Sequence, residues 1–436
     1  MMRWLYSGLM RLAQPLLKRK LLRRSQQEPG YAKDIPERFG HYAQAVPLHA
    51  GATLWLHAVS LGETRASAAL LAALRAQLPN LRLVLTHGTA TGRAEGQKLL
   101  QPGDLQAWQP WDTPAAVQQF LSHFKPDMGI LMETEVWPNL VAGCQRLGVP
   151  LVLVNARLSD KSLRQAQRLA WLARSAFAGL TAVWAQTPAD AARLQSLGAK
   201  VTGVLGNLKF DAQVNPTQLA AGRSWRNGSA RPVVMLASSR AGEELALLEN
   251  LKHFRPLALM DKARTAINNV VNEVQWLIVP RHPQRFEEVA ELIQAHGFEL
   301  QRRTAWPDAG PPPASGHEIW LGDSLGEMAL YYGLANVALL GGSFAPLGGQ
   351  NLIEAAACGC PVVMGPSTFN FAEAAEQALL AGAASRVKDM AEAVQTAVHL
   401  AQSPTELARR VQASSDFFEA NQGAVQRTAS AIKALL

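Results

Sequence analysis

Short apolar runs alternate with longer amphipathic stretches along most of this chain. In the first half, each such run precedes a stretch of helical periodicity, and the runs cover residues 53–56, 81–86, 128–132, 151–154 and 182–185. A second series covers residues 232–237, 276–279, 318–321, 337–340 and 361–364. Strand–helix alternation of this kind predicts parallel sheets that are covered by helices on both faces.

The length of the chain and its polar stretches divide these elements into domains. A chain of 436 residues exceeds one ordinary hydrophobic core, so we expect two doubly wound α/β domains with a ligand cleft between them. The expected parts are an N-terminal segment 1–40, a first domain 41–212, a linker 213–231, a second domain 232–412 and a C-terminal helix in 413–436. Packing of this last helix back on the first domain is one of its possible arrangements. The proline-rich stretch 301–316 is expected to be a surface loop.

The N-terminal segment is basic and amphipathic. Residues 1–24 contain seven Lys or Arg and no acid, and one helical face carries Leu5, Leu9, Leu12 and Leu16. The apolar runs are shorter than the roughly 20 residues of a spanning helix, and no signal-peptide cleavage site follows. Two interpretations remain: a first helix packed on the protein, or a helix lying in an anionic membrane surface, which Trp4 and Tyr6 favour.

Composition excludes several classes of function. The formal net charge of +8 favours an anionic partner. The three cysteines form neither a CxxC pair nor a disulfide framework, which is typical of a reducing cytoplasm. We find no HExxH, no Asp-x-Asp, no Gly-x-Ser-x-Gly and no interleaving of basic with aromatic residues. The sequence therefore predicts no metal, no cofactor and no nucleic-acid partner.

Charged residues of the first domain gather where the predicted strands end. Glu63 follows the first strand in HAVSLGETRAS, and Ser60-x-x-Glu63 has the spacing of a capping box, so Glu63 is either a helix cap or a catalytic base. A carboxylate at a helix N-terminus is expected to stay ionised near neutral pH. Glu133, Arg157 and Lys209 follow other strands. Because parallel strands end at one edge of a sheet, the four side chains are expected to surround one polar crevice.

The second domain carries three candidate nucleotide-binding stretches. Arg281, His282 and Arg285 in PRHPQR are expected to face a phosphate, unless they form a solvated basic loop. In GGSFAPLGGQNLIEAAACG, glycine N–H groups and a helix N-terminus favour a phosphate as well. Glu354 in the same stretch is placed either to bind ribose hydroxyls or to cap a helix. GDSLGE can offer the backbone amides of residues 325 and 326.

Taken together, these stretches resemble the 3-deoxy-D-manno-octulosonic acid (Kdo) transferases of Gram-negative bacteria. The resemblance covers residues 6–424 and rests on the order of many blocks, each of which is weak by itself. The matching blocks are HAVSLGE, TATG, METEVWPNL, NARLSDKS, GNLKFD, VPRHPQRF, GDSLGEM, GGS, GGQNLIEAAACGCPVVMGPSTFNF and NQGA.

The resemblance implies a GT-B glycosyltransferase with two facing Rossmann-like domains, the first for the acceptor and the second for the nucleotide sugar. It implies an inverting, metal-independent transfer of Kdo from CMP-Kdo to the lipid A precursor lipid IVA, at the cytoplasmic face of the inner membrane. The implied general base is Glu63, and the implied transition-state stabilisers are Glu133 and Lys209. The implied nucleotide contacts are Pro280, Arg281, Leu325, Gly326, Glu327, Asn351, Leu352, Ile353 and Glu354.

The chain also departs from the family pattern. Arg240 stands where relatives commonly carry a histidine, and we expect it to replace that histidine as a phosphate donor. Arg157 and His282 are further expected contacts for the acceptor or a phosphate. The stretch 252–275 is longer than the usual helix-to-strand connection, and a Phe-Ala-Pro-Leu run follows GGS.

Overall fold

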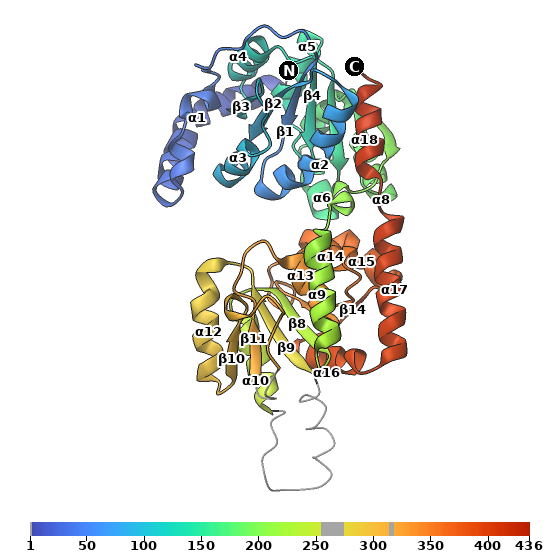
Figure 1. Cartoon of the computed structure of the whole chain (residues 1–436). Helices are drawn as coiled ribbons and strands as arrows, with labels where there is room; N and C mark the ends of the chain where they lie inside the picture. The colour runs from blue at the N-terminus through green and yellow to red at the C-terminus, as the bar shows by residue number, and fades with distance from the viewer. Residues whose placement is uncertain (1, 254–273, 314–317) are drawn as a thin grey trace, which may run out of the picture. The chain divides into compact units, whose positions relative to one another are not determined.

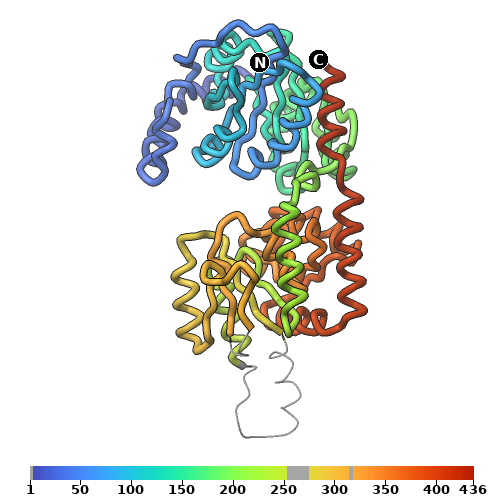
Figure 2. Tube along the Cα trace, in the orientation of Figure 1, coloured from blue at the N-terminus to red at the C-terminus, as the bar shows by residue number. Residues whose placement is uncertain are grey.

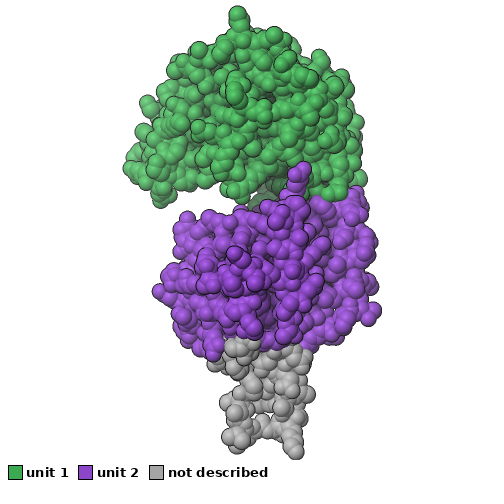
Figure 3. Space-filling view, viewed as in Figure 1, with its two compact units in different colours: residues 1–212, 421–436 green, residues 213–420 purple. Residues whose placement is uncertain are grey.

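The computed structural model describes residues 2–253, 274–313 and 318–436 (Figure 1). The chain divides into two compact units, coloured in Figure 3: residues 1–212 with 421–436, and residues 213–420. Figure 2 follows the chain through unit 1, into unit 2 and back to unit 1 at its C-terminal end. Most of the long stretch 252–275 lies outside the described residues.

Unit 1 is built on a parallel seven-stranded sheet in the order β3-β2-β1-β4-β5-β6-β7. Its strands are β1 Thr53–His57, β2 Arg82–His87, β3 Leu105–Trp108, β4 Met128–Met132, β5 Leu151–Ala156, β6 Ala182–Ala185 and β7 Val201–Val204. Its helices are α1 Met2–Gln27, α2 Leu61–Gln77, α3 Ala90–Gln97, α4 Pro114–Phe124, α5 Pro138–Leu147, α6 Asp160–Arg168, α7 Ala170–Ala178, α8 Pro188–Ser196 and α18 Ala424–Lys433. Two hydrophobic clusters contain alternate residues of the central strands and the helices packed on them, so the sheet is buried between two layers.

Unit 2 repeats this plan with the parallel sheet order β10-β11-β9-β8-β12-β13-β14. Its strands are β8 Val233–Ser239, β9 Gln275–Pro280, β10 Glu299–Arg302, β11 Glu318–Leu321, β12 Val337–Leu340, β13 Val362–Met364 and β14 Ala384–Arg386. Its helices are α9 Pro216–Gly228, α10 Glu243–His253, α12 Phe286–Ala295, α13 Met328–Leu334, α14 Leu352–Ala357, α15 Ala372–Leu380, α16 Met390–Ala401 and α17 Pro404–Ala420. The expected doubly wound α/β fold is therefore confirmed.

Four strands were not expected from the hydrophobic pattern, and they are the four edge strands β3, β7, β10 and β14. Each contains partly exposed residues, whereas β1 and β4 are buried at every position. An edge strand needs no continuous apolar run, because part of it faces solvent. The stretch 301–316 accordingly begins inside β10 and is not a loop throughout.

The segment expected to be a linker contains helix α9, which packs closely on α13. Asn215 caps this helix and Pro216 is its first residue, a common helix start. Two glycines permit the close approach: a Cβ at Gly222 would lie 2.1 Å from the Leu330 carbonyl oxygen, and one at Gly333 would lie 2.7 Å from that of Leu219. The polar composition of this segment did not indicate a packed helix, because the buried residue of α9 is a glycine, Gly222.

The C-terminal residues 413–436 form the end of α17 and the whole of α18. Helix α18 belongs to unit 1 and packs on α2, with Val425, Ala429 and Ile432 buried in the same cluster as Leu70 and Leu74. The carboxylate of Asp211 accepts the N–H groups of Gly423 and Val425, both at 2.6 Å, at the start of this helix.

Helix α1 carries the basic N-terminal sequence and is attached to unit 1 by one side. Leu21 is buried with Tyr31 and Trp108, and Ser7 donates a hydrogen bond to Asn139 at 2.9 Å. Large apolar side chains on the other side are exposed: Trp4, Leu5, Leu9, Leu12 and Leu16. Among the residues that the structure describes, no helix has both the length and the apolar character to cross a membrane.

Replacing Asp211 by Ala should lower the free energy of unfolding by about 2 kcal/mol, because two charge-assisted hydrogen bonds to α18 are lost. Asp211→Asn should fall between this variant and wild type, since one oxygen acceptor remains. Urea unfolding measures both. The exposed Asp416 on α17 supplies the control, and Asp416→Ala should change stability by less than about 0.5 kcal/mol. Equal losses for Asp211→Ala and Asp416→Ala would contradict the role of Asp211.

Candidate active site

The candidate site of unit 1 lies where the strand order of its sheet reverses. Strand β1 pairs with β2 on one side and with β4 on the other. Connections from neighbouring strands diverge at such a switch point and leave room for a ligand at the carboxyl ends. Glu63 follows β1, and Glu133 directly follows β4, so the fold itself places both carboxylates at this edge.

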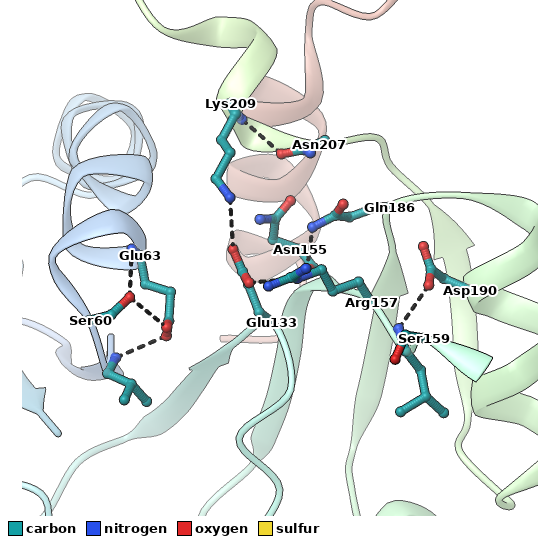
Figure 4. Close-up of polar contacts among 12 residues, drawn as sticks. Ser60, Glu63, Glu133, Asn155, Arg157, Ser159, Gln186, Asp190, Asn207 and Lys209 are labelled. Atoms are coloured by element: carbon teal, nitrogen blue, oxygen red, sulfur yellow. Dashed lines mark hydrogen bonds and ion pairs between the residues drawn. The ribbon is translucent and has the colours of Figure 1, made fainter. Parts of the chain in front are cut away.

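Glu63 makes the contacts of a helix cap. Ser60 is the N-cap of α2, and its Oγ accepts the Glu63 N–H at 3.3 Å while donating to Glu63 Oε1 at 2.9 Å. The second carboxylate oxygen, Oε2, accepts the Val59 N–H at 2.9 Å. The carboxylate is thus held in one orientation above the first turn of the helix (Figure 4).

The expectation that Glu63 stays ionised near neutral pH is not met. Burial raises its pKa to about 7, the Val59 N–H opposes this rise, and the negative charge of Glu133 adds to it. A carboxyl with this pKa exchanges its proton readily at neutral pH. Glu63 therefore makes the contacts of a helix cap and also has a pKa suited to a base.

Glu133 is a buried carboxylate held by two cations. Its side chain accepts from Arg157 Nε at 2.7 Å and from Lys209 Nζ at 3.2 Å (Figure 4). The residue is 5% exposed, and burial alone would raise its pKa, but Lys209 and Arg157 outweigh burial and lower it. Its backbone is left-handed, with φ of 57°, which is rare outside glycine and asparagine and frequent at functional sites.

Lys209 is positioned by residues that were not candidates from the sequence. Lys209 lies on the short helix Leu208–Asp211, which Asn207 caps by accepting the Lys209 N–H at 3.0 Å. Asn155 Oδ1 accepts the Leu208 N–H at 3.1 Å. Gln186 Nε2 donates to the Asn155 carbonyl at 3.0 Å. Asn155 and Asn207 stand inside NARLSDKS and GNLKFD, but short polar residues after a strand have no spacing that identifies such a role.

In unit 2 a carboxylate fills the corresponding switch point between β8 and β12. Glu243 is buried and accepts backbone N–H groups from Arg240, Gly342, Phe344 and Ala345 at 2.8–3.3 Å. Burial raises its pKa against the effect of these donors. The expectation that the GGS loop offers its amides to a phosphate is therefore wrong for residues 342, 344 and 345, because Glu243 already uses them.

The basic stretch after β9 divides into exposed and structural residues. Pro280 is buried at the end of the strand, whereas Arg281 and His282 are exposed. Arg240 Nη1 lies 3.0 Å from His282 Nε2, and burial, Arg240 and Arg281 lower the histidine pKa. Arg285 instead binds the buried Glu244 through both terminal nitrogens, at 2.6 and 3.2 Å. Arg240, Arg281 and His282 thus form a basic cluster, and Arg285 mainly holds α10.

The loop Gly322–Glu327 exposes Leu325 and Gly326 to solvent. Leu325 is 71% exposed, and Gly326 has φ of 79°, a left-handed conformation that favours glycine. Glu327 binds Arg303 at 3.0 Å and also accepts from Ser324. Arg303 in turn lies 5.1 Å from the ring centre of Trp225. The Glu327 carboxylate therefore shapes the loop, and Arg303 is a partner that sequence reasoning missed.

Helix α14 offers two kinds of group. Asn351 is its N-cap and accepts the Ile353 N–H at 3.2 Å. The side chains of Leu352 and Ile353 are buried, so these two residues can meet a ligand only through their backbone. The Glu354 side chain is exposed, and its role toward a ribose stays a prediction. Among the described residues, no group of three or more His, Cys, Asp or Glu side chains is arranged to hold a metal ion.

The comparisons by sequence agree on one family. The family model of the 3-deoxy-D-manno-octulosonic-acid transferases (kdotransferases) matches residues 33–212. A 3-deoxy-D-manno-octulosonic acid transferase of Bordetella pertussis is 43% identical over 99% of both chains. One of Haemophilus influenzae is 30% identical over 100% of this chain and 99% of the relative. A structure of a UDP-GlcNAc 2-epimerase from Neisseria meningitidis, bound to UDP-GlcNAc, matches 88% of this chain and 100% of the epimerase chain, with a TM-score of 0.56. At 14% identity, this similarity shows the fold alone.

The raised pKa of Glu63 predicts a pH-dependent stability. Because the folded protein holds this proton more tightly than the unfolded chain, whose ordinary value is 4.5, wild type should lose stability relative to Glu63→Gln as pH rises from 4.5 to about 7. Urea unfolding of both proteins at about pH 5 and about pH 8 measures the change.

Glu95→Gln is the matched control. Its hydrogen bond to Lys98 lowers the pKa of Glu95, so this carboxylate is ionised at both pH values and its contribution should differ little between them. If the stability difference between wild type and Glu63→Gln is the same at both pH values, the pKa of Glu63 is not raised.

Proposed function

This chain belongs to the Kdo transferase family, and we propose that it moves Kdo from CMP-Kdo to lipid IVA at the cytoplasmic face of the inner membrane. That the chain is a Kdo transferase rests on its full-length likeness to named relatives. The acceptor, the stereochemistry and the residue roles are our proposal. The observation that carries it is Glu63, a fixed carboxyl with a pKa of about 7 beside the ion pairs of Glu133.

Glu63 acts as the general base. Its carboxylate takes the proton of the acceptor hydroxyl while that oxygen forms a bond to the anomeric carbon of Kdo. The bond between this carbon and the CMP phosphate oxygen breaks on the opposite face, which inverts the anomeric centre. CMP leaves as a phosphate monoester dianion, and Glu63 then releases its proton to solvent. A base with a pKa near the working pH combines a sufficient ionised fraction with sufficient basicity.

Glu133, Lys209 and Arg157 supply the electrostatics on the acceptor side. Lys209 and Arg157 are partly exposed, at 22% and 45% of their side chains, and both are oriented by the buried Glu133. Cations placed in this way are suited to stabilising negative charge that develops on the substrate. Arg157 is suited to an acceptor phosphate or a sugar carboxylate because a guanidinium binds such groups through two N–H donors. The proposed transfer uses these cations instead of a metal or cofactor.

The donor is assigned to unit 2. Arg240, Arg281 and His282 form a basic cluster at the carboxyl ends of β8 and β9, where cations favour the phosphate of a nucleotide. We assign the exposed Glu354 to the ribose hydroxyls, and the backbone of Leu325 and Gly326 to the remainder of the nucleotide. Pro280 and Glu327 shape these loops, and Asn351, Leu352 and Ile353 form the start of the neighbouring helix.

Helix α1 is assigned to the membrane surface, where the lipid acceptor resides. Its exposed leucines and Trp4 stand among seven cationic residues. Apolar side chains of this kind insert at the headgroup boundary, and Lys and Arg attract anionic lipids. The proposed partner is therefore the anionic inner-membrane surface and not a nucleic acid.

The decisive assay incubates purified protein with CMP-Kdo and lipid IVA and measures CMP release. Wild type should release CMP only when lipid is present, and kcat/KM should rise with pH through about 7 as Glu63 ionises. Glu63→Gln should lower kcat by about 10²–10⁴-fold because the base is lost. Its affinity for CMP should change less than about twofold, since Glu63 lies in the acceptor-side unit.

The exposed ion pair of Glu95 provides a matched control, and Glu95→Gln should keep wild-type activity. CMP release without lipid would support a hydrolase, and binding without turnover would support a non-catalytic protein. Full activity in Glu63→Gln would remove Glu63 as the base.

Replacing Leu5, Leu9 and Leu12 together by Gln should weaken binding to vesicles that contain phosphatidylglycerol by at least about tenfold, because each change removes apolar area from the interface. Vesicle co-sedimentation measures the loss, and CMP affinity should not change. Leu380→Gln is the control, because this leucine is 89% exposed but lies at the end of α15. Equal vesicle binding by the triple variant and wild type would contradict the membrane assignment of α1.

A further inference from the structure

Asn155 occupies a special position beside the Glu133 ion pairs. It lies at the end of β5, is 2% exposed and has a left-handed backbone with φ of 51°. The backbone on either side of it is bonded to Glu133: the Glu133 N–H donates to the Val154 carbonyl at 3.0 Å, and the Arg157 N–H donates to the Glu133 carbonyl at 3.3 Å. Two residues that flank Asn155 in the sequence, Val154 and Arg157, are thus bonded to the Glu133 backbone, which places Asn155 close to Glu133.

The orientation of its amide is fixed as well. The Leu208 N–H can donate only to an oxygen, so the side-chain atom that it contacts at 3.1 Å is Oδ1. The amide nitrogen Nδ2 must then lie on the other side, where it is buried and has no hydrogen-bond partner among the described residues. Figure 4 shows this side chain beside the Glu133–Lys209 pair. A buried donor without an acceptor is costly and calls for an explanation.

The single positive charge of Lys209 has two interactions to make. It pairs with Glu133, and in the proposed reaction it must also stabilise an anionic oxygen of the substrate. When Lys209 turns to the substrate, a carboxylate that is 5% exposed loses one of its two cations. Removing one partner from a buried ion pair is strongly unfavourable unless another donor replaces it.

We propose that Asn155 is a positioning residue. Its unpaired amide N–H donates to the Glu133 carboxylate in place of Lys209 when Lys209 turns to the substrate. The unpaired donor thereby gains an acceptor, Arg157 keeps its own contact with Glu133, and Glu133 stays ionised and in place. This inference rests on the proposed function, because it takes Lys209 to contact the reacting substrate. No covalent step is involved.

A double-mutant cycle tests the exchange without substrate. Lys209→Ala mimics the departure of the lysine, so Asn155 should already donate to Glu133 in that background. Asn155→Gly suits the left-handed backbone and removes the amide. It should lower Tm by at least about 2 °C more in the Lys209→Ala background than in wild type. Equal Tm losses in the two backgrounds would overturn the proposal.

Asn207→Gly is the matched control in the same region. Asn207→Gly removes the acceptor of the backbone N–H of residue 209. The Lys209→Ala variant still has this N–H, so Asn207→Gly should lower Tm equally in both backgrounds.

Kinetics supply a second, independent readout. Asn155→Asp keeps an oxygen for the Leu208 N–H but has no N–H to give to Glu133, so kcat should fall by at least about tenfold while KM for CMP-Kdo changes less than about twofold. Wild-type kcat in this variant would overturn the proposal even if Asn155→Gly fails to fold. Failure of the proposed function would appear separately, as absence of lipid-dependent CMP release by wild type.

Discussion

The burial of one carboxylate, Glu133, constrains the candidate site of unit 1. A buried charge must be paired, and both of its partners come from other elements: Arg157 follows β5 and Lys209 lies beyond β7. The requirement therefore ties three strand ends together, and removing one partner from such a pair typically costs about 3–5 kcal/mol. Asn207 and Asn155 serve the same constraint, because they fix the short helix that carries Lys209.

Glu133 and Glu63 share one edge of the sheet but titrate in opposite directions. Burial acts to raise the pKa of both carboxyl groups. For Glu133, the charges of Lys209 and Arg157 outweigh burial and lower the pKa, whereas the pKa of Glu63 stays raised. Its negative charge then contributes to the raised pKa of Glu63. Two carboxyl groups whose environments separate their pKa values are suited to different roles, one as an exchangeable base and one as a permanent charge. The ionised state of Glu133 thus helps to make Glu63 basic.

The sequence predicted the centre of each sheet better than its edges. Buried central strands are continuous apolar runs, whereas β3, β7, β10 and β14 lack such a run because they are partly solvated. Charged residues at strand ends, such as Glu63 and Lys209, were visible as candidates because the fold class places strand ends together. The contacts of Glu243 and Arg303 were not visible, since they depend on loop conformations that residue type and spacing do not determine. The roles of the candidate residues remain predictions.

Glu63 is expected to exchange its proton near neutral pH while Glu133 stays ionised. Titration of the glutamate carboxyl carbons by NMR in ¹³C-labelled protein measures both ionisations, with Glu63→Gln and Glu133→Gln used to assign the two signals. Glu63 should titrate at about pH 7, and Glu133 should titrate below its ordinary value of 4.5. A Glu63 signal that titrates near 4.5, or a Glu133 signal that titrates above 4.5, would show that the two carboxyl groups do not have these separate roles.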